Sequence, residues 1–152
     1  MQLNYSNVCE VKLTYSNKVK ASERLAIKQS KEVYTFLRDY VFNPETIEFR
    51  ESFKLVLLNG ANKILGFSTI SDGGLNSTIA DVRMIMQAAL LSNASAMIIA
   101  HNHPSGQLHP SEEDKFLTNK IKSASDVLNI KLLDHVIVTS EGYYSFADEG
   151  RI

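Results

Sequence analysis

A short, wholly apolar run from Ala96 to Ala100 constrains the fold of this 152-residue chain more than any other segment. A run of this length without a polar position is typical of a central β-strand that is buried on both faces, as in parallel or mixed sheets. The first polar side chain after it is His101. We therefore expect a sheet covered on both sides, with this strand delivering a histidine at its carboxyl end.

Predicted helices and strands alternate around this run. The strands Ser52 to Leu58 and Lys63 to Ile70 are joined through Asn59-Gly60, a strong signal for an antiparallel hairpin. Three helices are predicted, from Ser30 to Val41, from a Thr78-x-x-Asp81 capping pattern through Leu90, and from Ser111 to about Leu128. Ser30 can cap the first helix, whose apolar face consists of Val33, Tyr34, Leu37, Tyr40 and Val41, and the inward side of the third consists of Leu117, Ile121, Ala124 and Leu128. Further strands are predicted over Lys131 to Val138 and Tyr143 to Phe146. This order predicts an α/β fold, a mixed β-sheet flanked by helices.

The amino-terminal part carries weaker signals. Val8 to Tyr15 alternates apolar and polar residues, which predicts a half-buried strand, and Asn17 to Glu23 is polar enough for a loop. Ser71 to Ser77, with two glycines, is a second predicted loop. Because the length suits one domain and no low-complexity tract interrupts the chain, we expect a single domain over residues 1–152.

Composition excludes several classes of function. The net charge is −1, with 16 Lys and Arg against 17 Asp and Glu, and the densest basic stretch, Lys115 to Lys122, has the spacing of a solvated helix face, so there is no strong nucleic-acid signal. The single cysteine, Cys9, rules out an internal disulfide and any multi-cysteine metal site. No apolar run approaches a membrane span and no export signal is visible, so no membrane association is expected and a cytoplasmic location is the default.

The residues after the apolar run form a potential metal site. Because side chains alternate along a strand, His101 and His103 point to the same side. Asp114, in the first turn of the next helix, is close enough in sequence to supply an oxygen. Two histidines and one carboxylate leave a fourth tetrahedral position for water, as in catalytic zinc sites. Ser111-x-x-Asp114 is also a plain helix-capping pattern, and capping can coexist with metal binding.

Activation of such a water requires a general base, and hydrolysis requires a group that stabilises the oxyanion. Glu51, at the start of the strand Ser52 to Leu58, is a candidate base, although the residues alone do not select it among 17 acidic side chains. The Ser111 hydroxyl is the candidate oxyanion donor. His135 has two interpretations: a group that orients a ligand imidazole, or a hydrogen-bonded core histidine.

Taken together, His101-x-His103 and, after seven residues, Ser111-x-x-Asp114 resemble the signature of the JAMM (JAB1/MPN+) metalloproteases. The RadC-like branch of bacterial JAMM domains is more narrowly similar, on the segments His101 to Gly106, Pro110-Ser111, Leu117-Thr118 and Leu133 to Val138. The resemblance covers about Phe49 to Ile152. Residues 1–48 lie outside its strongest part.

The resemblance implies the roles of five residues. It makes Glu51 the catalytic glutamate and Ser111 the oxyanion-stabilising serine, with His101, His103 and Asp114 as the ligands of Zn²⁺. It also implies a three-layer sandwich similar to cytidine deaminase. The expected activity is that of a zinc metallopeptidase, a hydrolase that cleaves a peptide or isopeptide bond of an unknown peptide or protein substrate with a zinc-activated water.

Other functional classes fit less well. A non-catalytic binding module, associated with DNA repair or a mobile element and retaining the metal site, stays open as the alternative, as does a homo-oligomer. A nucleobase deaminase needs His-x-Glu and Pro-Cys-x-x-Cys, which one cysteine excludes. A serine hydrolase would need a Gly-x-Ser-x-Gly elbow, which Pro104-Ser105-Gly106 does not provide. In HNH nucleases the three residues are dispersed over the fold, unlike the contiguous His101-Asn102-His103.

Overall fold

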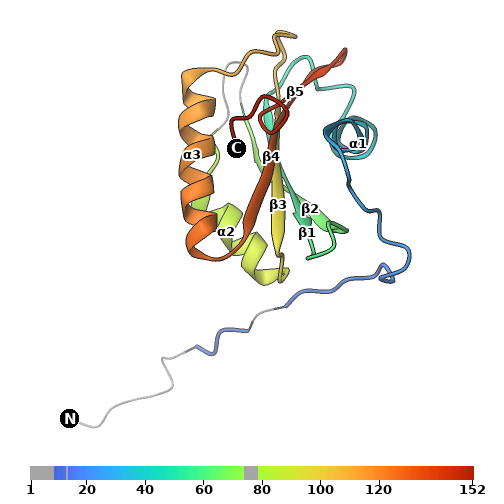
Figure 1. The fold of residues 1–152 in the computed structure, drawn as a ribbon, viewed down its shortest axis with the longest axis vertical. Helices are drawn as coiled ribbons and strands as arrows, with labels where there is room; N and C mark the ends of the chain where they lie inside the picture. The colour runs from blue at the N-terminus through green and yellow to red at the C-terminus, as the bar shows by residue number, and fades with distance from the viewer. Residues whose placement is uncertain (1–8, 13, 74–78) are drawn as a thin grey trace, which may run out of the picture.

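The computed structural model describes residues 9–12, 14–73 and 79–152 and contains a five-stranded mixed sheet in the order β2-β1-β3-β4-β5 (Figure 1). β1 is antiparallel to β2 and β3, β3 is parallel to β4, and β5 is antiparallel to β4. The elements are β1 (Ser52–Leu58), β2 (Ile64–Asp72), β3 (Ala96–Asn102), β4 (Lys131–Val138), β5 (Tyr143–Ser145), α1 (Ser30–Phe36) with the π-helical turn η2 (Leu37–Val41), α2 (Val82–Leu91) and α3 (Glu112–Val127). The expected α/β fold, a mixed sheet flanked by helices, is confirmed.

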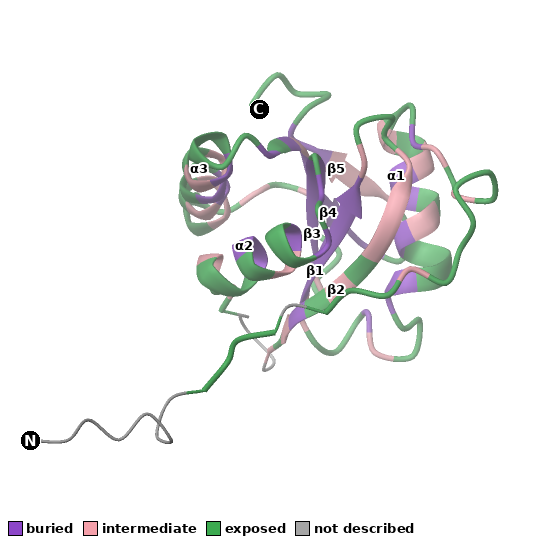
Figure 2. Ribbon diagram, turned by 90° about the horizontal axis from the view of Figure 1, so that it is seen from below, coloured by how far each residue is buried: buried purple, intermediate pink, exposed green. Residues whose placement is uncertain are grey.

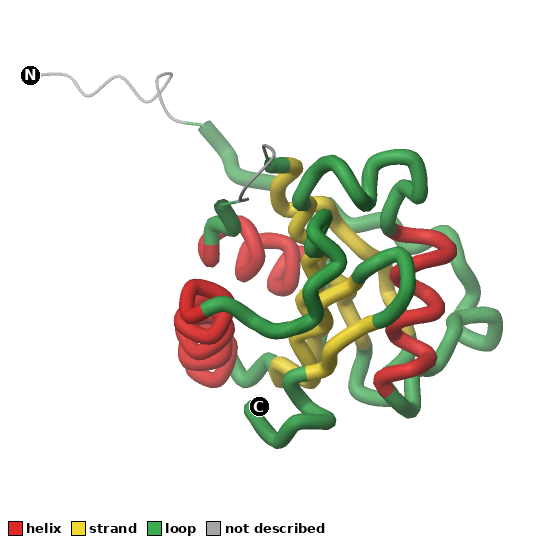
Figure 3. The backbone as a smooth tube through the Cα atoms, turned by 90° about the horizontal axis from the view of Figure 1, so that it is seen from above, coloured by secondary structure: helices red, strands yellow, loops and turns green. Residues whose placement is uncertain are grey.

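The sheet separates two helical layers. Helices α2 and α3 cover one face, and α1 with η2 covers the other (Figure 2; Figure 3, from the opposite end). Because side chains alternate along the strands, β3 contributes to both cores: Met97 and Ile99 pack with α2 and α3, whereas Ile98 and Ala100 pack with α1 and η2. Every residue of β3 is buried, as the apolar run predicted.

The predicted strand at residues 8–15 is wrong within the part of this segment that the structure describes, 9–12, 14 and 15. These residues form no strand, and Val11 is 84% exposed. Alternation produces a strand only where the backbone also pairs with a sheet edge. β2 is an edge strand, but the described part of this segment reaches it through a side chain: the Tyr15 hydroxyl donates to the Leu65 carbonyl at 3.2 Å.

The first helix differs from its prediction in phase. The predicted apolar face included Tyr40, yet Tyr40 is 76% exposed, while Val41 and Phe42 are buried. The cause is η2, in which the Phe42 amide donates to the Leu37 carbonyl five residues earlier, so the wider turn rotates the face. The helix begins at Ser30 itself, with Gln29 at the cap position instead of the predicted Ser30.

Three other local details differ from the prediction: the cap of α2, the loop before it and the residue that follows α3. Asp81 is the N-cap of α2 and accepts a hydrogen bond from the Arg83 amide, whereas the predicted cap Thr78 lies outside the described residues. The predicted loop over 71–77 is shortened because β2 extends to Asp72, and residues 74–77 of it lie outside the described residues as well. At the other end of the helical layer, Leu128 follows the last turn of α3 and is exposed, not inward.

A β-bulge in β4 changes which side chains face α3. Met97 pairs with Leu132, but the next residue of β3, Ile98, pairs with Asp134, so β4 holds one extra residue. Before the bulge Leu132 faces the core of α2 and α3, and after it Val136 and Val138 face the core of α1. The bulge therefore turns His135 toward α3, on the side to which His101 points.

None of the helices in the described part of the chain combines the length and the apolar character needed to cross a bilayer.

Candidate metal centre

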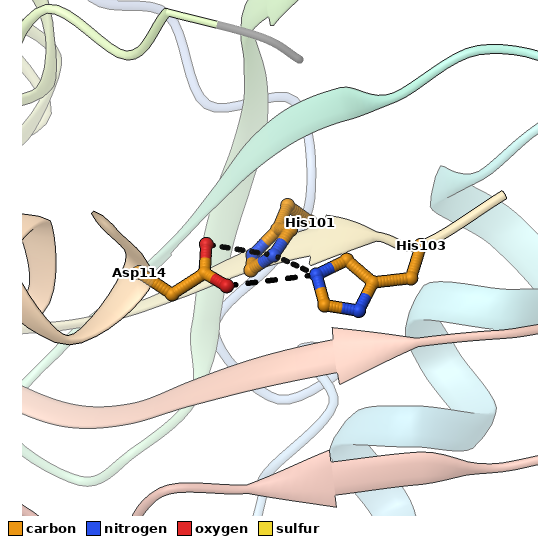
Figure 4. A group of neighbouring side chains, drawn as sticks. All are labelled: His101, His103 and Asp114. Atoms are coloured by element: carbon orange, nitrogen blue, oxygen red, sulfur yellow. Dashed lines mark hydrogen bonds and ion pairs between the residues drawn. The ribbon is translucent and has the colours of Figure 1, made fainter. Parts of the chain in front are cut away.

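Strand β3 and helix α3 bring His101, His103 and Asp114 together (Figure 4). The two histidines lie at the end of β3 and just after it, and both imidazoles extend toward α3. The loop that follows turns at Gly106, whose φ of 78° is a conformation that favours glycine. It leads into α3, where Asp114 lies in the first turn and points back to the histidines.

The three side chains have the spacing of ligands around one small ion. His101 Nε2 lies 2.9 Å from His103 Nε2 and 3.1 Å from Asp114 Oδ1, and His103 Nε2 lies 3.6 Å from Asp114 Oδ2. Around a tetrahedral zinc with bonds of about 2.0–2.1 Å, neighbouring ligand atoms are about 3.3 Å apart. The donor atoms therefore fit a zinc ion in number, chemistry and spacing.

A chain of hydrogen bonds fixes the tautomer of His101. The Thr118 hydroxyl donates its proton to the Asp114 carbonyl at 2.6 Å, so its oxygen must accept from His135 Nδ1, also at 2.6 Å. Burial lowers the pKa of His135 well below its ordinary value, so the ring is neutral and its Nε2 carries no proton. His135 Nε2 then accepts from His101 Nδ1 at 2.8 Å. The proton of His101 is thus on Nδ1, and its Nε2 presents a lone pair to Asp114 and His103.

His103 is oriented in the same way. Its Nδ1 donates to the Gln107 carbonyl at 2.7 Å, which directs the other nitrogen toward His101. Burial alone would lower the pKa of His103, but the Asp114 carboxylate and the Gln107 carbonyl outweigh it and raise the pKa. Two imidazole lone pairs and a carboxylate oxygen thus converge at distances that demand positive charge between them. Either a proton or a metal ion satisfies that demand.

Asp114 serves both as a helix-capping partner and as the third member of this group. The Ser111 amide and hydroxyl both donate to Asp114 Oδ2 at 2.7 Å, and the Asp114 amide donates back to Ser111 Oγ at 3.1 Å, which completes a capping box. Burial would raise the pKa of Asp114, but the nearby imidazoles of His101 and His103 and the hydrogen bond from the Ser111 hydroxyl hold it far below its ordinary value. The carboxylate is therefore ionised, with Oδ1 directed to His101.

The structure also brings Glu51 and Ser111 to this group. Both residues line a cleft of about 800 Å³ together with His101, His103 and Asp114. Glu51 immediately precedes β1, and its carboxylate interacts electrostatically with His103. All five residues singled out from the sequence therefore share one cleft.

Sequence reasoning missed three partners of the site. Of the two interpretations of His135, the hydrogen-bonded core histidine is confirmed: the ring is fully buried, stacks on Phe146 at 4.7 Å and forms a hydrogen bond with His101. Thr118 stood out only as part of the Leu117-Thr118 segment of the family resemblance, with no role assigned to it, and the Gln107 carbonyl carried no signal because loop carbonyls are common. Asn102 was visible only as the residue between His101 and His103.

Comparison with known proteins matches residues 27–151 to the model of the RadC-like JAB domain family. Three similar relatives are each named UPF0758 protein. The one from Flavobacterium johnsoniae is 41% identical over 124 residues, 82% of this chain and 52% of the relative. The one from Porphyromonas gingivalis is 47% identical over 66% of this chain and 45% of its own length. The one from Thermotoga maritima is 35% identical over 83% of this chain and 54% of its own length. The chain thus spans about half the length of these relatives.

Proposed function

Because the chain belongs to the RadC-like JAB domain family, we propose that it is a zinc-dependent metallohydrolase that cleaves a peptide or isopeptide bond in a peptide or protein substrate. One observation carries the proposal: three donor atoms converge at 2.9–3.6 Å, and the hydrogen bonds of both imidazoles direct their protons away from the point of convergence. A helix cap and a core histidine would require no such convergence.

His101, His103 and Asp114 would hold the ion, with His135 and the Gln107 carbonyl fixing the two imidazoles. A bound Zn²⁺ supplies a Lewis acid that polarises a carbonyl and makes water acidic near neutral pH. Two histidines and one carboxylate leave a coordination position open, as in catalytic zinc sites. The open cleft around the three residues gives a polypeptide chain access to that position.

Glu51 is the general base in this proposal. Its carboxylate takes a proton from the attacking water and delivers it to the leaving nitrogen, so that the amine leaves neutral. Support comes from its place on the wall of the same cleft, beside His103, and from its partial burial, which limits competition by bulk water.

Ser111 donates a hydrogen bond to the carbonyl oxygen of the scissile bond as negative charge develops there. In the structure its hydroxyl proton points to Asp114 Oδ2. Rotation about the Cβ–Oγ bond would turn this proton toward the cleft, while the Asp114 amide continues to donate to the same oxygen.

The test compares the unmodified protein with Glu51→Gln and the matched control Glu113→Gln, which makes the same change on an exposed residue of the same cleft. Metal content is measured by mass spectrometry on protein purified without chelator, and cleavage is measured on a peptide library and a lysine-linked isopeptide conjugate. We expect about one zinc per chain in all three proteins and cleavage by all but Glu51→Gln.

Three outcomes would count against the proposal or a part of it. Absence of metal from every protein would refute the metal centre. Equal cleavage by Glu51→Gln and the unmodified protein would refute the role of Glu51. Full zinc loading with no cleavage of any probe would favour the alternative, a binding module that retains the metal site.

A further inference from the structure

Asn102 lies between the two histidines but on the opposite face of β3, where it is completely buried. Its side chain contacts the segment that leads into β1. Nδ2 donates to the carbonyls of Ile47 and Arg50, both at 2.7 Å, and Oδ1 accepts from the amide of Ser52 at 2.8 Å. Both amide protons and the carbonyl oxygen of Asn102 are thus used on one short stretch of backbone.

These hydrogen bonds flank Glu51 on either side. The last backbone pair between β1 and β3 joins Phe53 to His101, so the side chain of Asn102 continues the connection where the ladder ends. Two of its bonds are to the carbonyl of Arg50 and the amide of Ser52, the residues directly before and after Glu51.

The register also determines where Glu51 points. Residues opposite each other in an antiparallel pair project to the same face, and the rings of Phe53 and His101 stack in parallel at 6.0 Å. Glu51 precedes Phe53 by two residues, which returns its side chain to that face, and it does line the cleft there. The end of β3 therefore carries the two histidines on one face. On its other face it carries Asn102, which binds the backbone on either side of Glu51.

We propose that Asn102 is a positioning residue that holds the Glu51 carboxylate in place relative to His101 and His103, an inference that rests on the proposed function. Residues 43–51, between η2 and β1, form turns and no strand, so backbone pairing does not fix this segment on β3. Asparagine suits the position because it offers two donors and one acceptor on a short side chain. Aspartate would retain the acceptor but present negative charge to two carbonyls, and leucine would remove all three bonds.

The test uses the full chain with zinc and the variants Asn102→Leu and Asn102→Asp, so that a folding failure of one leaves the other. The matched control is Ile98→Ala, a buried residue on the same strand and face that pairs with Val56, away from Glu51 along β1. We expect zinc affinity within about threefold of the unmodified protein, because Asn102 touches no ligand side chain. The Ser52 amide should exchange with solvent about tenfold faster or more than in Ile98→Ala, measured by NMR.

Cleavage gives the second measurement, as a double-mutant cycle with Glu51→Gln. We expect the Asn102 variants to lose about 100-fold in kcat with little change in KM, and to lose almost nothing further when Glu51 is already Gln. Equal losses in both backgrounds, or a crystal structure of a zinc-loaded variant with Glu51 unmoved, would overturn the inference. If the unmodified protein cleaves nothing, the proposed function fails, whereas amide exchange and the position of Glu51 still decide whether Asn102 holds it.

Discussion

Replacement of Thr118 by valine should weaken zinc binding even though Thr118 is not a ligand. Valine keeps the β-branched shape but removes the oxygen that accepts from His135 Nδ1 at 2.6 Å. The His135 ring, fully buried between the rings of Phe53 and Phe146, has no access to water as a substitute. A buried N–H without a partner costs about 1–3 kcal/mol.

The imidazole can relieve that cost by moving its proton to Nε2. His135 Nε2 would then donate to His101 Nδ1, which is 2.8 Å away, and would displace the proton of His101 onto the nitrogen that faces Asp114. Zinc must reverse this shift in order to bind. Loss of partners that orient a metal-bound histidine typically weakens metal binding 10- to 100-fold, so we expect a loss of about 1.4 to 2.8 kcal/mol in zinc affinity for Thr118→Val.

The assay is competition for zinc against a chromophoric chelator, combined with ¹⁵N shifts of the imidazoles, which report the tautomer. Ser125→Ala is the control, because Ser125 is also buried on α3 and donates to the Lys122 carbonyl, away from the histidines. Zinc affinity of Thr118→Val within about twofold of Ser125→Ala, with the tautomer of His101 unchanged, would refute the hydrogen-bond chain as the source of ligand orientation.

Three further changes test other parts of the structure. Ser111→Ala removes the N-cap of α3 and should lower the free energy of unfolding of the metal-free protein by about 1 kcal/mol, measured with urea; an unchanged midpoint would contradict the cap. Zinc at about 100 times its Kd should stabilise the protein by about 2.7 kcal/mol and raise its Tm, an effect that a chelator reverses and that Asp114→Ala should lack; an equal rise in Asp114→Ala would place the metal elsewhere. Burial raises the pKa of Asp134 above 3.8, so the folded state favours its protonated form, and the stability this group contributes is fully present below pH 3.8 and is lost as the pH rises through the raised pKa. Asp134→Asn should reduce this decrease in the free energy of unfolding with rising pH, measured by urea unfolding at several pH values. An unchanged dependence on pH would contradict the contribution of Asp134.

The sequence predicted the sheet well because its strands carry local signals. The apolar run at Ala96 and the Asn59-Gly60 turn determine a buried centre and a hairpin without reference to the rest of the chain. Strands β1 and β4 have the predicted bounds. The described residues of the segment 8–15 satisfied the same alternation rule but form no strand, because no local pattern reports whether a backbone pairs with a sheet edge elsewhere in the fold.

The residues of the candidate site also differ in how far local sequence signals could predict them. His101, His103, Asp114 and Ser111 lie within fourteen residues, so strand alternation and a helix cap were enough to bring them together in advance. Glu51 lies fifty residues upstream of His101, and only the resemblance to a known family singled it out.

His135 required knowledge that the sequence does not contain. Strict alternation from Leu132 directs His135 to the α1 side of the sheet, away from His101. The extra residue between Leu132 and Asp134 reverses that direction. A bulge of this kind is the result of pairing with β3 and of packing on both faces, and it leaves no signature in the residues themselves.

The tripeptide at the end of β3 explains why the ligands and the proposed base can be kept in register although they lie on different strands. Alternation directs His101 and His103 to α3, where Asp114 and the His135 chain meet them, and directs Asn102 to the backbone around Glu51. A shift of β3 along its axis would therefore move the two histidines and the backbone around Glu51 together. The distance between the histidines and Glu51 would then change less than the position of either. By the same reasoning, a substitution that loosens only Asn102 separates them while the metal centre stays intact. A substitution on the Asn102 face of β3 should thus reduce catalysis while zinc binding is retained, whereas a substitution on the histidine face should reduce zinc binding itself.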